Sequence, residues 1–176
     1  TILNLGILNG YLGNNGGYFM RKECYGYEIN NCYSTGIINT NHGGGIVGYR
    51  QSYVRHSKSI IWNCYSRGDI NNSHCGGIVG GDTGYEWYSG SSNKSVTLIE
   101  NCYSSGDIKG SYCGGILGKG ISRNTYANIV VRNCYALGDI KARYCGGIIG
   151  PENGIGNNRV YIYNCYYAGL IGDFYN

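Results

Sequence analysis

The chain has 176 residues, a formal net charge of +4 and only 14% charged residues. Lys and Arg are scattered without a run, so the charge pattern does not favour nucleic-acid binding. No apolar stretch reaches the 18 residues that would indicate a membrane-spanning helix.

The composition favours a folded protein with a polar, aromatic surface. Gly accounts for 32 residues, well above the usual share of about 7%, but no Gly-X-Y period indicates collagen. The hydrophobic content of 42% argues against disorder, and the 20 Tyr residues suit contact with a partner. Nine Cys residues predict an oxidising site of action.

A repeated motif organises the chain. The stretch NCYSRGDINNSHCGGIVG at 63–80 recurs as NCYSSGDIKGSYCGGILG at 101–118 and NCYALGDIKARYCGGIIG at 133–150. Related copies begin at Asn31 and Asn164, so the Asn-Cys-Tyr blocks lie 31 to 38 residues apart. Self-similarity at this period predicts a repeat architecture. We expect one repeat array over 1–176, with blocks 1–30 (partial), 31–62, 63–100, 101–132, 133–163 and 164–176 (partial).

The first block is expected to begin in the middle of a repeat. Gly10-Tyr11-Leu12-Gly13 aligns with the Gly-Ile-Val-Gly of 77–80, which places Leu8 in the position of the second cysteine. The last block is expected to end at Asn176, just before the position of the Gly-Gly pair.

The expected elements are short strands. No segment has the apolar rhythm of a helix, whereas β-branched and aromatic runs precede the Asn-Cys-Tyr blocks at 59–62, 96–99, 129–131 and 160–163. Two shorter strands per repeat are expected at the Ile38, Ile70, Ile108 and Ile140 positions and in the Gly-Ile-Val-Gly blocks. Three short strands per repeat predict an all-β, single-stack β-solenoid of about five coils.

Stacking of the repeats would place equivalent residues in columns. The Asn residues of the Asn-Cys-Tyr blocks are expected to hydrogen-bond from repeat to repeat, and the Ile46, Ile78, Ile116 and Ile148 positions to fill the core. The polar stretches 49–58, 81–95, 119–128 and 151–159 are expected to be loops that carry variation in binding.

The motif also resembles a known family. The pattern GGIVG…NCYSRGDI…CGGIVG is similar to the GLUG-motif repeats of bacterial surface adhesins, with relatives in giant viruses and protists. The resemblance covers nearly the whole chain. It implies β-solenoid stalks and surface attachment, with no catalytic residues to carry over.

The cysteines leave three interpretations open. Three repeats carry cysteines eleven residues apart, which predicts the disulfides Cys64–Cys75, Cys102–Cys113 and Cys134–Cys145. Cys32 has no cysteine eleven residues further on, and Cys24 is the candidate for its disulfide partner. The second interpretation is buried free thiols in columns, and the third is a metal site, which the spacing does not fit. Because nine is odd, Cys165 is the candidate free or inter-chain thiol.

Other motifs favour structure over chemistry. Asp69, Asp107 and Asp139 recur in a Gly-Asp-Ile turn, where Asp caps a turn through its own backbone. They are a weak basis for the minor alternative, a carbohydrate-active β-helix enzyme. We therefore expect no enzyme activity, no cofactor and no metal.

Aromatic residues are the candidate contacts with a partner. Tyr33, Tyr65, Tyr103, Tyr135 and Tyr166 occupy one column, which predicts stacking along the solenoid. The predicted partner contacts are instead aromatic residues of the variable loops, because large amphipathic rings are enriched in interfaces. They are Tyr53, Tyr85, Trp87, Tyr88 and Tyr126.

The two ends of the array suggest a function. Segments 1–8 and 169–175 are apolar and β-prone, and open solenoid edges are templates for strand addition. The first hypothesis is a structural subunit of an extracellular, cell-surface or virion-surface fibre that polymerises head-to-tail with itself. The alternative is an adhesin-type segment that contacts glycan or a host protein. A fragment of a longer array is also left open.

Overall fold

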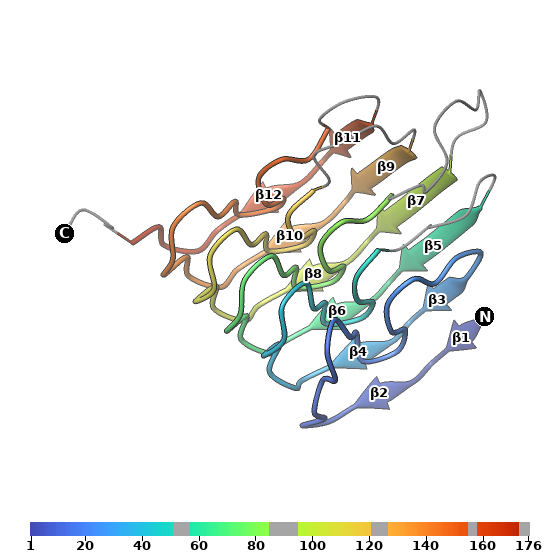
Figure 1. Ribbon diagram of the computed structural model, residues 1–176, viewed down its shortest axis with the longest axis horizontal. Helices are drawn as coiled ribbons and strands as arrows, with labels where there is room; N and C mark the ends of the chain where they lie inside the picture. Colours follow the sequence, from blue (N-terminus) through green and yellow to red (C-terminus); the bar gives the residue numbers. More distant parts are fainter. Residues whose placement is uncertain (51–56, 85–94, 121–126, 155–157, 173–176) are drawn as a thin grey trace.

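The computed structural model describes residues 1–50, 57–84, 95–120, 127–154 and 158–172. These residues contain no helix and form two parallel sheets of six strands each, which lie along the same stacking direction (Figure 1). The all-β prediction is confirmed, and the regular stacking is compatible with a β-solenoid.

Each repeat contributes one strand to each sheet. The first sheet has the order β1-β3-β5-β7-β9-β11 and the second the order β2-β4-β6-β8-β10-β12. The first-sheet strands are β1 (Ile2–Leu3), β3 (Glu28–Asn30), β5 (Lys58–Trp62), β7 (Ser95–Glu100), β9 (Ala127–Arg132) and β11 (Arg159–Tyr163). The second-sheet strands are β2 (Gly6–Ile7), β4 (Tyr33–Ser34), β6 (Tyr65–Ser66), β8 (Tyr103–Ser104), β10 (Tyr135–Ala136) and β12 (Tyr166–Tyr167).

The β-branched runs predicted as strands form β5, β7, β9 and β11. Burial alternates along β5, β7 and β9, and in β7 every second residue is buried, because successive side chains of a strand point to opposite faces. The outer strand β11 has no buried residue. The strands pair in parallel and in register, so Ile61 lies beside Ile99 and Ile99 beside Val131. All three of these side chains are fully buried.

The other two predicted strands of each repeat are shorter than expected. Ile38, Ile70, Ile108 and Ile140 are linked by isolated parallel bridges, and so are the glycine and valine positions of the Gly-hydrophobic blocks. The glycines bring backbones too close for a side chain: a Cβ on Gly77 would overlap the Gly115 carbonyl oxygen and Ser104 Oγ. The two-residue strand that follows each Asn-Cys pair was not predicted.

The structure corrects the predicted frame of the first repeat. Gly17 bridges Gly44 and Met20 bridges Val47, so the Gly-hydrophobic block of this repeat is 17–20 and not 10–13. β1 pairs with β3, which places Asn4-Leu5-Gly6 where later repeats have Asn-Cys-Tyr. The first block therefore contains the same elements as its neighbours, although it has lost the cysteine and tyrosine that identify them. Below, each repeat is named by its first asparagine: Asn4, Asn31, Asn63, Asn101, Asn133 or Asn164.

The core consists of two hydrophobic clusters. The larger cluster contains the buried residues of the first sheet, the Ile46, Ile78 and Ile116 column, and Cys32, Cys64, Cys102 and Cys134. The smaller cluster contains Leu12, the Ile38, Ile70, Ile108 and Ile140 column, and Cys75 and Cys113. The expected Ile46 column is confirmed, with its last member, Ile148, partly buried against the larger cluster.

Candidate functional site

The asparagine ladder predicted from the sequence is present. Asn101 Nδ2 donates to Asn63 Oδ1 and Asn133 Nδ2 donates to Asn101 Oδ1, both at 3.2 Å. The same donation links Asn31 to Asn4 and Asn164 to Asn133, whereas Asn63 donates to Asn30. All six first asparagines have φ between 49° and 54°, a conformation that Asn tolerates better than most residues. Asn therefore both turns the chain between the two strands and bonds to the next repeat.

The tyrosine column predicted from the sequence is also confirmed. Successive rings from Tyr33 to Tyr166 stack with centroid separations of 4.9 to 5.1 Å and interplanar angles of 2° to 8°. The separation matches the strand spacing of ~4.8 Å, so the rings lie flat on one another along the stacking direction. The column covers the outer side of the second sheet.

A second aromatic stack was not predicted as such. His42, His74, Tyr112 and Tyr144 precede the second-cysteine position, and their ring centroids lie 4.7, 5.3 and 4.9 Å apart in succession. All four have positive φ. The four residues occupy the same position of the repeat, and this alignment is the sequence signal for the stack. The change from His to Tyr along the column hides it, because two different residue types share one stack.

Charged groups surround the histidine end of this stack. Lys119 lies over the Tyr112 ring at 5.3 Å and pairs with Glu152 at 3.1 Å. Burial lowers the pKa of His42, and nearby Lys119 and Arg50 lower it further. Burial also lowers the pKa of His74, with His42 and Lys119 adding to the shift. Both imidazoles are therefore harder to protonate than a solvent-exposed histidine.

The aspartate column joins one repeat to the next. Asp107 N donates to Asp69 Oδ1, Asp139 N to Asp107 Oδ1 and Leu170 N to Asp139 Oδ1, each at 3.0 Å. Lys109 pairs with Asp69, and Lys141 pairs with Asp107. The structural role predicted for these carboxylates fits this geometry, but each carboxylate binds the backbone of the following repeat instead of its own.

The expected disulfides are not formed, because all nine cysteines are free thiols in the structure. Cys64, Cys102 and Cys134 belong to the larger core cluster, whereas their expected partners Cys75, Cys113 and Cys145 pack in or against the smaller one. The two cysteines of one repeat thus face different clusters. The arrangement matches the second interpretation of the sequence, buried thiols in columns.

Each column places cysteine against cysteine one repeat away. Cys75 N donates to Cys113 Sγ at 3.3 Å, and Cys113 N donates to Cys145 Sγ at 3.5 Å. In the other column, Cys102 is fully buried and its Sγ donates to Glu100 O at 3.2 Å. Burial raises the pKa of Cys102 well above its usual range, so its thiol is protonated and unreactive.

The three remaining cysteines differ in exposure. Cys32 is buried in the larger cluster, whereas Cys24 and Cys165 are partly exposed. The expected Cys24–Cys32 disulfide is absent, and Cys24 Sγ instead approaches Lys22 O at 3.6 Å. Cys165 is free and lies on the outermost described repeat, in the same column as Cys134.

The predicted partner-contact aromatics fall outside the described residues. Tyr53, Tyr85, Trp87, Tyr88 and Tyr126 all lie in 51–56, 85–94 or 121–126. Their role stays a prediction.

The outer repeats expose the apolar columns that the inner repeats bury. In the Ile38 column, Ile140 is 3% exposed but Ile171, its neighbour in the last repeat, is 71% exposed. At the other end, Leu5 is 49% exposed, whereas Cys32, its equivalent in the next repeat, is 1% exposed. β1 and β11 are the outer strands of the first sheet, and β2 and β12 are those of the second. The described residues therefore present two apolar faces with unpaired strand edges.

Within the described ranges, no three His, Cys, Asp or Glu side chains gather as metal ligands would. No helix in those ranges is long and apolar enough to cross a membrane. No protein-family model, curated protein or solved structure matches the chain.

Proposed function

We propose that the chain is a structural subunit of an extracellular or surface fibre, built as a GLUG-like β-solenoid of about five coils and a partial sixth. Copies would join head-to-tail, with the last repeat of one copy covering the first repeat of the next. The observation that carries the proposal is the change from 3% exposure at Ile140 to 71% at Ile171 in one core column.

Burial of the exposed apolar columns would drive this association. Each buried Leu or Ile side chain contributes about 1.5–3 kcal/mol relative to the exposed state. Leu3, Leu5 and Leu8 at one end and Leu170 and Ile171 at the other are all exposed. Covering both faces with a neighbouring copy would bury Ile171, which continues the Ile140 column, and Leu5, which aligns with the buried Cys32.

Two polar features of the ends fit the same joint. Within a copy, the ladder runs from the Nδ2 of each later asparagine to the Oδ1 of an earlier one. Asn164 Oδ1 of one copy and Asn4 Nδ2 of the next copy are the acceptor and donor that would continue it. The outer edges of β1 and β11 are parallel strands of matching direction, which allows strand addition. A heterologous contact of this kind does not close, so it produces a filament.

A surface location is part of the proposal. A sparsely charged, tyrosine-rich surface suits contact with neighbours. Cys165, a free thiol on the outermost described repeat, stays the candidate for a bond between copies.

The experiment is sedimentation velocity of the chain and two matched variants. Ile171→Lys places a charge on the end face, and Leu137→Lys places one at a 41%-exposed position on the side of an inner repeat. The proposal predicts large, concentration-dependent species for the unmodified chain and Leu137→Lys, but monomers for Ile171→Lys. Monomers of the unmodified chain at high concentration would contradict it.

A further inference from the structure

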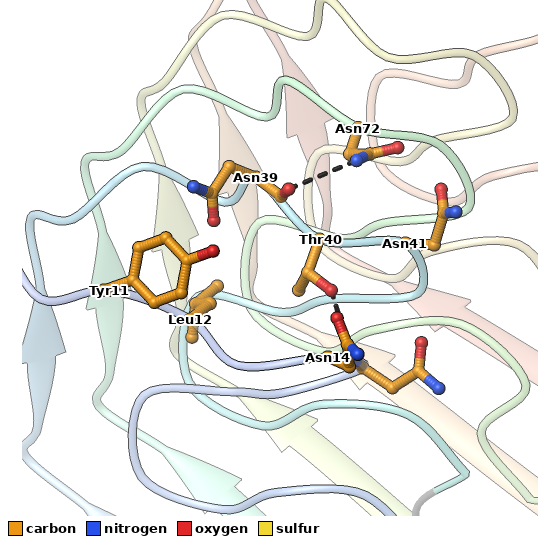
Figure 2. Close-up of a pocket in the computed structure, with 8 residues that line it drawn as sticks. Tyr11, Leu12, Asn14, Asn39, Thr40, Asn41 and Asn72 are labelled. Carbon is orange, nitrogen blue, oxygen red and sulfur yellow. Dashed lines mark hydrogen bonds between the residues drawn. The ribbon is translucent and has the colours of Figure 1, made fainter.

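A polar pocket lies on the side of the first three repeats. It has a volume of about 340 Å³ and is lined by Tyr11, Leu12, Asn14, Asn15, Asn39, Thr40, Asn41 and Asn72. These residues come from the Asn4, Asn31 and Asn63 repeats, so the pocket spans three successive repeats. Figure 2 shows Tyr11 beside Asn39, with Asn41 and Asn72 on the other side of Thr40.

Part of this lining is fixed by bonds between repeats. Thr40 Oγ1 accepts from Asn15 N at 3.0 Å, and Asn72 Nδ2 donates to Asn39 O at 3.1 Å (Figure 2). Asn72 Oδ1 also accepts from Ser73 N at 2.8 Å. Thr40 is buried. The floor of the pocket is therefore held in place before any ligand binds.

Within the described part of the chain, three asparagines of the pocket have neither the positive φ nor the side-chain hydrogen bonds that account for Asn15, Asn72 and the ladder asparagines. The ladder asparagines and Asn15 have positive φ, and Asn72 is bonded through both ends of its amide. Asn14, Asn39 and Asn41 do not have positive φ, and their side-chain amides form no hydrogen bond with other described residues. Each amide offers two donors and one acceptor to the pocket.

Tyr11 adds an aromatic surface next to these amides. It is 85% exposed, the highest value among the exposed large hydrophobic side chains of the described residues. It does not belong to either aromatic stack. A ring in this position leaves its apolar surface in water and contributes nothing to the core. A ligand that packed against the ring would cover this surface.

The chemistry of the lining selects the class of ligand. No charged side chain lines the pocket, so it does not suit a phosphate, a carboxylate or a metal ion. Neutral amides bond hydroxyl groups as both donors and acceptors, and an aromatic ring packs against an apolar face. A neutral saccharide combines many hydroxyl groups with such a face.

We propose that this pocket binds a neutral oligosaccharide, with Tyr11 packing against one sugar ring and the amides of Asn14, Asn39 and Asn41 bonding its hydroxyl groups. Ile171 and the strands whose edges form the proposed joint do not line the pocket, but Tyr11 and Asn14 belong to the first repeat, which the joint would cover. The proposal places the glycan contact on Tyr11 and the pocket asparagines. The aromatic residues of the variable loops were the contacts predicted from the sequence.

The test is binding of the full chain to an array of neutral and anionic oligosaccharides, followed by titration calorimetry with the tightest neutral binder. Tyr11→Ala is expected to weaken binding about tenfold, and Asn41→Asp about fivefold or more. Tyr11→Phe keeps the ring and is expected to keep most of the affinity. Tyr25→Ala, at a 55%-exposed tyrosine outside the pocket, is the matched control and should bind like the unmodified chain.

Three results would overturn the proposal: no neutral oligosaccharide binds, only anionic ones bind, or Tyr11→Ala and Tyr25→Ala bind equally well. Ile171→Lys separates this site from the fibre, since a monomeric variant should retain the affinity. Circular dichroism of each variant confirms that the fold is unchanged.

Discussion

Asp107 accepts a hydrogen bond from the backbone N–H of Asp139, one repeat further on, at 3.0 Å. Its other carboxylate oxygen pairs with Lys141. The same contact recurs at Asp69 and Asp139. The sequence predicts a turn role for these aspartates, whereas in the structure their carboxylates link one repeat to the next.

This link predicts a graded response to substitution of Asp107. Asp107→Asn retains an oxygen for Asp139 N but loses the ion pair, which is largely exposed, so its effect should be small. Asp107→Ala removes the acceptor as well and should destabilise by about 1 kcal/mol. Urea unfolding measures both values. Equal stability of the two variants would show that the backbone hydrogen bond contributes nothing.

The same carboxylate predicts acid sensitivity. The Lys141 ammonium holds the pKa of Asp107 below its usual range. A carboxylate with a lower pKa in the folded state stabilises the fold above its unfolded pKa, and this stabilisation is lost as pH falls through the folded pKa. The unmodified chain should therefore lose stability below about pH 4, and Asp107→Asn should lose less over that window. Identical acid profiles of the two proteins would contradict the link.

The histidine stack predicts a second pH effect, at milder acidity. Burial lowers the pKa of His42 and His74, so the unfolded chain binds protons first and stability falls as pH drops below about 6.5. His74→Tyr introduces the residue found at the equivalent Tyr112 and should reduce this loss between pH 7 and 5. Thermal unfolding of both proteins between pH 7 and 5 measures this pH dependence. If the unfolding temperature falls equally with pH in both, His74 is not responsible.

The asparagine ladder predicts an unusual ranking of substitutions. Asn101 has a φ of 51° and bonds the asparagines on both sides. Asn101→Gly keeps the conformation and loses the bonds, whereas Asn101→Ala loses the bonds and adds a backbone cost of about 1–2 kcal/mol. Ala should thus be more destabilising than Gly. In an ordinary strand interior Gly is the worse residue, so the opposite ranking would contradict the left-handed turn.

The cysteine columns predict selective thiol reactivity. Burial raises the pKa of both Cys102 and Cys165, but Cys102 is 0% exposed and Cys165 is partly exposed. A thiol reagent should modify Cys165 and Cys24 in the native chain, and Cys102 only after unfolding. Mass spectrometry of digested protein locates the modified sites. Nine reactive thiols after denaturation without reductant would agree with the free columns, and fewer would indicate disulfides.

The sequence predicts the repeat, the strands before each Asn-Cys pair and the stacked columns, because identical residues at a fixed period must occupy identical environments. It fails where that identity is lost. Asn4-Leu5-Gly6 keeps only the asparagine of its motif, so pairing of β1 with β3 was needed to place it. The cysteine pairing also failed, since spacing along the chain does not tell which core cluster each side chain of a repeat enters.

The pocket could not be predicted for a related reason. Tyr11 and Asn14 belong to the misaligned first repeat, and they approach Asn39 and Asn41 only once the frame is corrected. The loop aromatics were the stronger sequence signal because they are large and clustered, whereas scattered asparagines look like ordinary turn residues.

Electron microscopy of the purified chain, with and without reductant, tests head-to-tail assembly most directly. The account predicts unbranched filaments with an axial repeat of about 29 Å, set by six strands per sheet at ~4.8 Å each. Because the proposed joint consists of apolar side chains and paired strand edges, the filaments should persist under reductant. Dispersed particles in both conditions would contradict the fibre, and filaments lost on reduction would place a disulfide in the joint.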